Sequence, residues 1–121
     1  MAERYSSFEP NSTLWLLQRV TAVFLIGVLA YHFLWLHFVN HAADITFAGT
    51  QARMSQIGYF VTMVLFLIAG AFHGLNGVYN ALVNQGLDGT PKTVVKWLLV
   101  IAGLVLIVQG LRVAAAMTTL V

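Results

Sequence analysis

The sequence IGYFVTMVLFLIAGAFHGLNGVYNALV, residues 57–83, contains no Asp, Glu, Lys or Arg, and its histidine, His73, lies deep inside it. A helix of this length rises about 40 Å at about 1.5 Å per residue, so it can cross about 30 Å of hydrocarbon with some tilt. An ionisable side chain at such a depth normally faces the protein interior and has a partner there. The stretch therefore predicts a membrane-spanning helix with a functional histidine.

Two further apolar runs flank this stretch, at residues 14–39 and 94–117, and each is long enough to span a bilayer. The whole chain is 60% hydrophobic and 8% charged, which is too apolar for a soluble domain. A polar stretch, 41–56, separates the first two runs, and turn-forming residues at 84–92 separate the last two. We therefore expect one all-α membrane domain over residues 1–121, with three transmembrane helices.

The basic residues divide unevenly between the two sides of such a domain. Four fall on the side that the N-terminus shares with the second loop, and two fall on the other side; they are Arg4, Arg19, Lys92 and Lys96 against Arg53 and Arg112. Cytoplasmic loops of membrane proteins carry an excess of Lys and Arg. This bias predicts a cytoplasmic N-terminus and an external C-terminus.

The first twelve residues are polar and include Glu3 and Glu9, unlike a transit peptide, which is rich in Arg and poor in acidic residues. We therefore expect no cleavable targeting segment and direct insertion into a prokaryotic cytoplasmic membrane. The segment Asn11-Ser12-Thr13 offers an N-cap to the first span.

Composition also excludes several classes of function. The chain has no cysteine, so disulfides, thiolate catalysis, iron–sulfur ligation and c-type haem attachment through this chain are excluded. Its few basic residues form no stripe, which argues against a nucleic-acid partner. The histidines are therefore the main candidates for chemistry.

A stripe of small and polar side chains runs along one face of the helix predicted at 57–83; it comprises Gly70, His73, Gly77, Asn80 and Asn84, with Asn76 close by. In one interpretation the stripe is a contact between helices, in which His73 hydrogen-bonds a neighbour. In the other, His73 ligates the iron of haem b and the glycines leave room for the porphyrin. One chain supplies one ligand at that depth, so a second histidine would come from another protein chain.

Two more histidines, His32 and His37, lie in the first span, about 140° apart around a helix. By helical rise, His32 lies about 27 Å from the start of that span and His37 about 35 Å, whereas His73 lies about 16 Å from the cytoplasmic end of its own span. His32 and His73 are therefore expected to serve different irons. His37 is expected near the outer interface, beside His41, which we interpret as an interfacial loop residue.

Arg19 lies about one and a half turns into the first span. Its long side chain could reach the cytoplasmic headgroups, as basic residues near helix ends commonly do. Alternatively, its guanidinium could bind an anionic haem propionate or a quinone carbonyl. Position alone leaves both interpretations open.

Together these segments resemble one known family. The segment WLLQRVTA at residues 15–22 and the segment HGLNG at residues 73–77 are similar to the first and second helices of the small membrane-anchor family of succinate dehydrogenase (succinate:quinone oxidoreductase). The five-residue spacing of His32 and His37 resembles a histidine pair in some members. The resemblance covers nearly the whole chain, and its most specific part is the HGLNG segment.

The resemblance implies a fold and a set of partners. The three helices would form half of a bundle that a companion anchor subunit completes. The pair would hold an iron–sulfur subunit and a flavoprotein subunit on the membrane, and electrons would pass to quinone. Succinate chemistry would belong to the flavoprotein, so this chain would have no active site of its own.

The resemblance also implies roles for particular residues. His73 would be an axial ligand of a haem b shared with the companion anchor, and His32 would bind a second, outer haem, with His37 in reserve. Arg19, Asn84 and Gln85 would lie near the quinone or a haem propionate. Many relatives carry Asp-Tyr where this chain has Asn84-Gln85, and an amide can donate a hydrogen bond to a quinone carbonyl but cannot supply a proton as a phenol does.

These observations predict a haem b-binding anchor of a succinate dehydrogenase or fumarate reductase, with one or two haems. Within the family, the alternative is a haem-poor anchor in which His73 only hydrogen-bonds a neighbour. Outside it, the alternative is a small three-helix membrane scaffold or transporter accessory subunit without redox function. A complex without flavin and without a haem spectrum would identify the scaffold.

Overall fold

The structure is a computed structural model that describes residues 13–121 as an all-helical chain. In order, its elements are α1 (Thr13–Leu34), the π-helical turn η2 (Trp35–Val39), the 3-10 turn η3 (Ala42–Asp44), α2 (Phe47–Met54), α3 (Ile57–Asn84) and α4 (Gly89–Ala116). Three helices are long and apolar enough to cross a membrane, at Thr13–Val39, Ile57–Asn84 and Gly89–Ala116. The all-α fold with three spans is confirmed. The expected cap at Asn11 and Ser12, and Arg4, lie outside the described residues.

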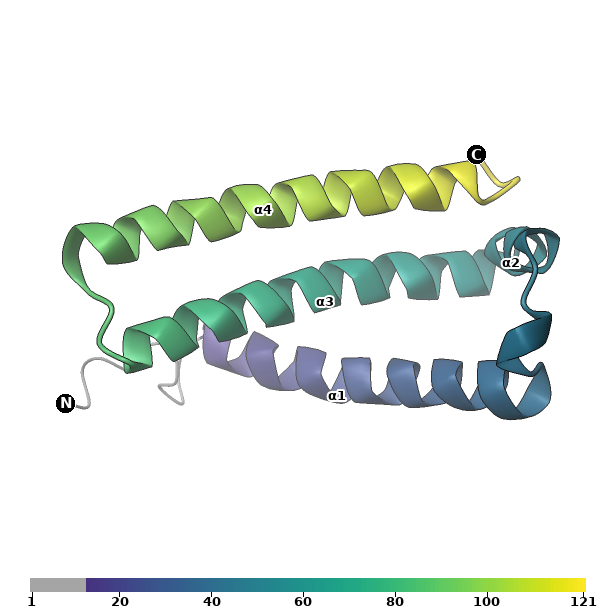
Figure 1. The fold of residues 1–121 in the computed structure, drawn as a ribbon, viewed down its shortest axis with the longest axis horizontal. Helices are drawn as coiled ribbons and strands as arrows, with labels where there is room; N and C mark the ends of the chain where they lie inside the picture. The colour runs from purple at the N-terminus through teal and green to yellow at the C-terminus, as the bar shows by residue number, and fades with distance from the viewer. Residues whose placement is uncertain (1–12) are drawn as a thin grey trace.

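The three long helices form a single layer with α3 in the middle and α1 and α4 on either side of it (Figure 1). The start of α1 and the connection between α3 and α4 lie at one end of this layer, whereas α2 and the C-terminus lie at the other. Few side chains are buried: α1 has none, and α3 contributes Ala71, Asn80 and Val83. Broad apolar faces of α1 and α4 therefore remain exposed in the isolated chain.

Close packing of α3 on α4 depends on two glycines of α4. A β-carbon on Gly103 would collide with a δ-carbon of Leu75, and one on Gly110 would come within 2.5 Å of a δ-carbon of Leu67. Small residues let membrane helices approach closely, where van der Waals packing replaces the hydrophobic effect as the attraction. The helix at 89–116 therefore forms one of the two helix–helix interfaces of the layer.

Gly103→Val is expected to destabilise the α3–α4 interface. Overpacking a tight contact costs about 1–3 kcal/mol, and Leu75 must move to admit the new side chain. The thermal midpoint of the detergent-purified protein should fall. Ala102→Val adds bulk to an exposed neighbour on the same helix and should leave the midpoint near the wild-type value. If adding Leu75→Ala to Gly103→Val does not restore stability, the loss does not arise from this contact.

Two local features differ from the sequence expectation. The polar stretch at 41–56 contains the short helix α2, whose N-terminus is capped by Thr46: its hydroxyl accepts a 3.1 Å hydrogen bond from the Gly49 amide. Helix α4 begins at Gly89 rather than at 94, because Pro91 lies in its first turn, where a missing amide hydrogen removes no helical hydrogen bond. Both differences lie outside the apolar runs from which the spans were predicted.

Candidate functional site

His73 lies near the middle of α3 and faces α1. Its Nδ1 lies 3.1 Å from the Thr21 hydroxyl, and its backbone carbonyl accepts a 3.1 Å hydrogen bond from the Gln18 side-chain amide. The Asn76 amide donates in turn to Oε1 of Gln18, at 2.7 Å. We call these four residues, Gln18, Thr21, His73 and Asn76, the His73 cluster. It is a polar contact between two apolar helices, and all four side chains are half-buried.

Helical periodicity explains how the cluster forms. Gln18 and Thr21 are three residues apart on α1, as are His73 and Asn76 on α3, so each pair lies on one helix face. Gly77 lies beside them, and a β-carbon there would be 3.4 Å from the Gln18 amide nitrogen. The small residues of the stripe thus admit the polar side chains of α1, as in other membrane helix contacts.

The glycines of the stripe do not provide the open space that we expected for a porphyrin. A β-carbon on Gly70 would lie 3.8 Å from a δ-carbon of Leu25, so α1 fills the space beside Gly70 as it does beside Gly77. The stripe faces the neighbouring helix of its own chain, which sequence periodicity does not identify. The open position next to His73 is Gly74, where an added β-carbon would meet nothing within 4 Å.

The His73 side chain fits the role of one axial haem ligand. Its Nδ1 is held by Thr21, while Nε2 has no hydrogen-bond partner among residues 13–121. A metal-ligating imidazole typically has its second nitrogen held in this way. The same residues contain no group of three or more His, Cys, Asp or Glu side chains that could bind a metal ion. A single imidazole of this kind is a ligand that a haem could use, because a haem takes few ligands from protein.

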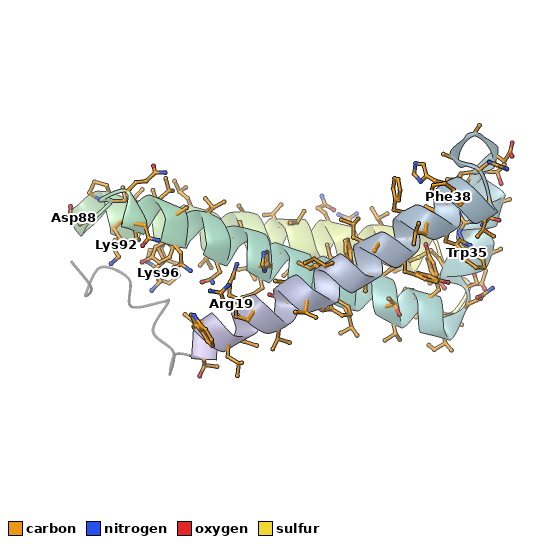
Figure 2. The ribbon with its side chains drawn as sticks, turned by 90° about the horizontal axis from the view of Figure 1, so that it is seen from below. Arg19, Trp35, Phe38, Asp88, Lys92 and Lys96 are labelled. Carbon is orange, nitrogen blue, oxygen red and sulfur yellow. The ribbon has the colours of Figure 1, made fainter. Side chains whose placement is uncertain are left out.

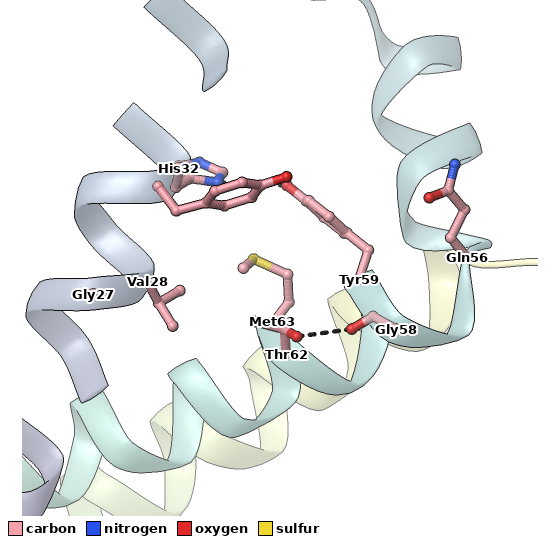
Figure 3. Close-up of a pocket in the computed structure, with 9 residues that line it drawn as sticks. Gly27, Val28, His32, Gln56, Gly58, Tyr59, Thr62 and Met63 are labelled. Carbon is pink, nitrogen blue, oxygen red and sulfur yellow. Dashed lines mark hydrogen bonds between the residues drawn. The ribbon is translucent and has the colours of Figure 1, made fainter. Parts of the chain in front are cut away.

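His32 lies on α1 at the other end of the α1–α3 contact. Its Nδ1 is 3.5 Å from the Tyr59 hydroxyl of α3. Both residues line a pocket of about 430 Å³ near α2 (Figure 3), a size within the range of small-molecule sites, about 300–1,000 Å³. The lining combines polar and apolar side chains from both helices: Gly27, Val28, Tyr31, His32, Gln56, Gly58, Tyr59, Thr62 and Met63.

The structure holds His32 and His73 apart. Their neighbours Thr21 and Tyr59 belong to different levels of the layer, and Thr21 precedes His32 by eleven residues, or about 16 Å of helix. His37 is exposed in the turn η2, where its Nδ1 lies 3.0 Å from the Phe33 carbonyl and its ring stacks on Phe33. His41 is exposed in the following loop. Of the four histidines, His32 and His73 are the ones placed between helices.

Arg19 is exposed on α1, with its guanidinium carbon 5.4 Å from the centroid of the Trp15 ring, within cation–π range. Figure 2 shows Arg19 toward the same end of the layer as Lys92 and Lys96, with Trp35 and Phe38 toward the other end. The structure does not bring Arg19 together with the predicted quinone contacts Asn84 and Gln85. These amides lie at the end of α3, at least eight residues, or about 12 Å, beyond the Asn76 that contacts α1.

Sequence reasoning missed three residues of these sites. Gln18 and Thr21 belong to the segment at 15–22 that carried the resemblance, but their polarity within an apolar run was not used. A polar pair three residues apart in a span does indicate an inward face, and this signal could have identified them. Tyr59 offered no such signal, since tyrosine is common at membrane interfaces.

Comparison with known proteins agrees with the fold and the length of the chain. Residues 2–111 match the family described as succinate dehydrogenase/fumarate reductase transmembrane subunit. The curated protein "Succinate dehydrogenase hydrophobic membrane anchor subunit" of Archaeoglobus fulgidus is 29% identical over 111 residues, which are 92% of this chain and 92% of that protein. No solved structure matches the chain.

Proposed function

This chain belongs to the succinate dehydrogenase/fumarate reductase transmembrane subunit family, and we propose that it binds haem b through His73 and passes electrons to quinone in the membrane. The haem would be shared with a companion anchor, which would supply a second histidine. The anchor pair would dock an iron–sulfur subunit, which carries electrons from a flavoprotein subunit. Haem and quinone supply the redox chemistry, and this chain supplies position and a ligand.

The observation that carries the proposal is the state of the His73 imidazole. It lies at mid-helix in an apolar span, with Nδ1 engaged by Thr21 and Nε2 left without a hydrogen-bond partner among the described residues. An imidazole nitrogen without a partner is costly in hydrocarbon. Ligation of an iron held between this chain and the companion anchor would satisfy it.

The pocket at His32 supports a second haem, nearer the outer face. His32 is its candidate ligand and His37 is the reserve, but only His32 lines the pocket. At the opposite end, α3 ends at Asn84 and Gln85, which are candidate contacts to quinone or a haem propionate. Arg19 lies apart from them and is a separate candidate for such a contact. The basic residues Arg19, Lys92 and Lys96 at that end support a cytoplasmic placement of the N-terminus in a prokaryotic membrane.

The exposed faces of α1 and α4 support the partner assignment. Side chains such as Val23, Ile26, Leu104 and Val105 are more than half exposed in the isolated chain. Lipid can cover some of this surface, and the companion anchor would cover the part beside His73. The layer would then become half of a helical bundle.

A second candidate function is an anchor of the same family without haem at His73. The filled spaces beside Gly70 and Gly77, and the hydrogen bond from His73 to Thr21, favour it because they make the stripe a helix contact. The two candidates differ in haem content and agree in their partners. Haem content is therefore the quantity that separates them.

Isolation of the complex in mild detergent, through a tag on this chain, tests the docking and electron-transfer parts of the proposal. We expect flavin to co-purify with the chain and succinate to reduce a soluble quinone analogue. Both properties should disappear when the tag pulls down this chain from cells that lack its companion anchor. A preparation without flavin would reject the docking role.

A further inference from the structure

The Thr21 hydroxyl has one hydrogen and three oxygen or nitrogen atoms near it. It lies 2.7 Å from the Leu17 carbonyl oxygen, 3.2 Å from the Gln18 carbonyl oxygen and 3.1 Å from Nδ1 of His73. A hydroxyl donates one hydrogen bond and accepts up to two, whereas a carbonyl oxygen only accepts. These limits determine which of the Thr21 hydroxyl and the His73 Nδ1 donates a hydrogen to the other.

The hydroxyl hydrogen must point to the backbone of α1. If it pointed to His73 instead, the lone pairs of two oxygens would meet at 2.7 Å with no hydrogen between them. With the hydrogen directed at the Leu17 carbonyl, the lone pairs of the hydroxyl face Nδ1, and the 3.1 Å contact becomes a hydrogen bond only if Nδ1 carries a hydrogen. The neutral His73 imidazole is then protonated at Nδ1 and carries its lone pair at Nε2.

From this we infer that Thr21 is a positioning residue: its hydroxyl selects the imidazole tautomer in which His73 presents Nε2 to a metal. The inference rests on the proposed function, in which His73 ligates haem iron. A hydrogen-bond acceptor on the second nitrogen also makes an imidazole a stronger electron donor, which favours ferric over ferrous iron. Thr21 should thus lower the reduction potential of the haem as well as hold the ring.

Gln18 fixes the α3 backbone at the same point. Its amide nitrogen donates to the His73 carbonyl, and its amide oxygen accepts from Asn76, so both ends of the side chain are satisfied between α1 and α3. Both contacts of this one side chain hold α3 against α1 within one turn of Thr21. These hydrogen bonds explain how α1, which has no buried residue, can keep the His73 imidazole at a fixed position beside Thr21.

Three variants of the assembled complex test the role of Thr21. Thr21→Val keeps the shape and removes the acceptor, and Thr21→Ser keeps the hydroxyl. Thr21→Ala removes the acceptor with a smaller side chain, in case the valine complex fails to assemble. Loss of such a partner typically weakens metal-site affinity about 10–100-fold. We expect Thr21→Val and Thr21→Ala to lose haem faster during dilution in detergent, with a raised midpoint potential for the haem that remains, and Thr21→Ser to behave like the wild type.

Thr93→Val provides the matched control. Its hydroxyl also faces a carbonyl of its own helix, that of Gly89 at 3.5 Å, but it is exposed on α4 and has no hydrogen bond to a histidine among the described residues. A wild-type midpoint potential and haem affinity in both Thr21→Val and Thr21→Ala would overturn the inference. Retention of all haem in His73→Ala would instead overturn the proposed function, whatever the Thr21 variants do.

Discussion

Substitution of His73 by alanine should abolish the proposed inner haem of the complex. The proposed haem would lose its ligand from this chain, and the other histidines of residues 13–121 lie elsewhere: His32 is beside Tyr59, and His37 and His41 are exposed. The haem-to-chain ratio should fall by one haem per complex, measured as extracted haem against flavin. We expect flavin to stay bound, because His73 lies at mid-helix in an apolar span and the proposed docking of the flavoprotein does not depend on its side chain.

Folding of this variant should be little affected, so a loss of haem would not be caused by misfolding. Thr21 retains its bond to the Leu17 carbonyl, so no buried donor is left without an acceptor. His41→Asn is the control, because His41 is exposed in the loop after η2 and should keep the full haem content. An unchanged haem-to-flavin ratio in His73→Ala would show that the histidine only bridges helices.

His32→Ala is expected to remove the proposed outer haem and leave the proposed inner one. A complex that carries two haems should therefore retain about half of its haem, and the remaining half should depend on His73. The physical reason is the separation of the two side chains by about 16 Å of helix, so that they would ligate different irons. Quantitation of haem in the single variants and in the double variant His32→Ala/His73→Ala measures this directly.

His37→Ala distinguishes the two first-helix candidates. His37 is exposed and its Nδ1 faces the Phe33 carbonyl of its own helix, so the variant should keep both haems. If His32→Ala has full haem content and His37→Ala loses one haem, the assignment moves to His37. If neither variant changes the content, the pocket beside Tyr59 does not hold haem.

The fold could be predicted from the sequence because it depends on hydropathy. The apolar runs at 14–39 and 57–83 correspond within a residue to Thr13–Val39 and Ile57–Asn84, since hydrocarbon forces every backbone group into a helix. The start of α4 was harder to predict, because residues 89–93 are not part of the apolar run and join the helix with a proline in its first turn. The short helix α2 was missed because its eight residues are too few to show a helical repeat of apolar side chains.

The site could be predicted only in part. The inward stripe of α3 was visible from the positions of Gly70, His73 and Gly77, but which helix it faces depends on how α1 rotates about its axis. That rotation is set by the contacts of Gln18 and Thr21, each of which involves a residue more than fifty positions away. Periodicity within one helix therefore placed His73 correctly between helices and misjudged what fills the glycine spaces beside it.

Haem b binding by this anchor can be tested on the wild-type complex, isolated through a tag on this chain, by a dithionite-reduced minus oxidised spectrum. We expect a b-type α-band, with one or two haems for each flavin in the preparation. A complex that contains flavin and gives a flat spectrum would contradict haem binding, and His73 would then be a contact between α1 and α3 and no more.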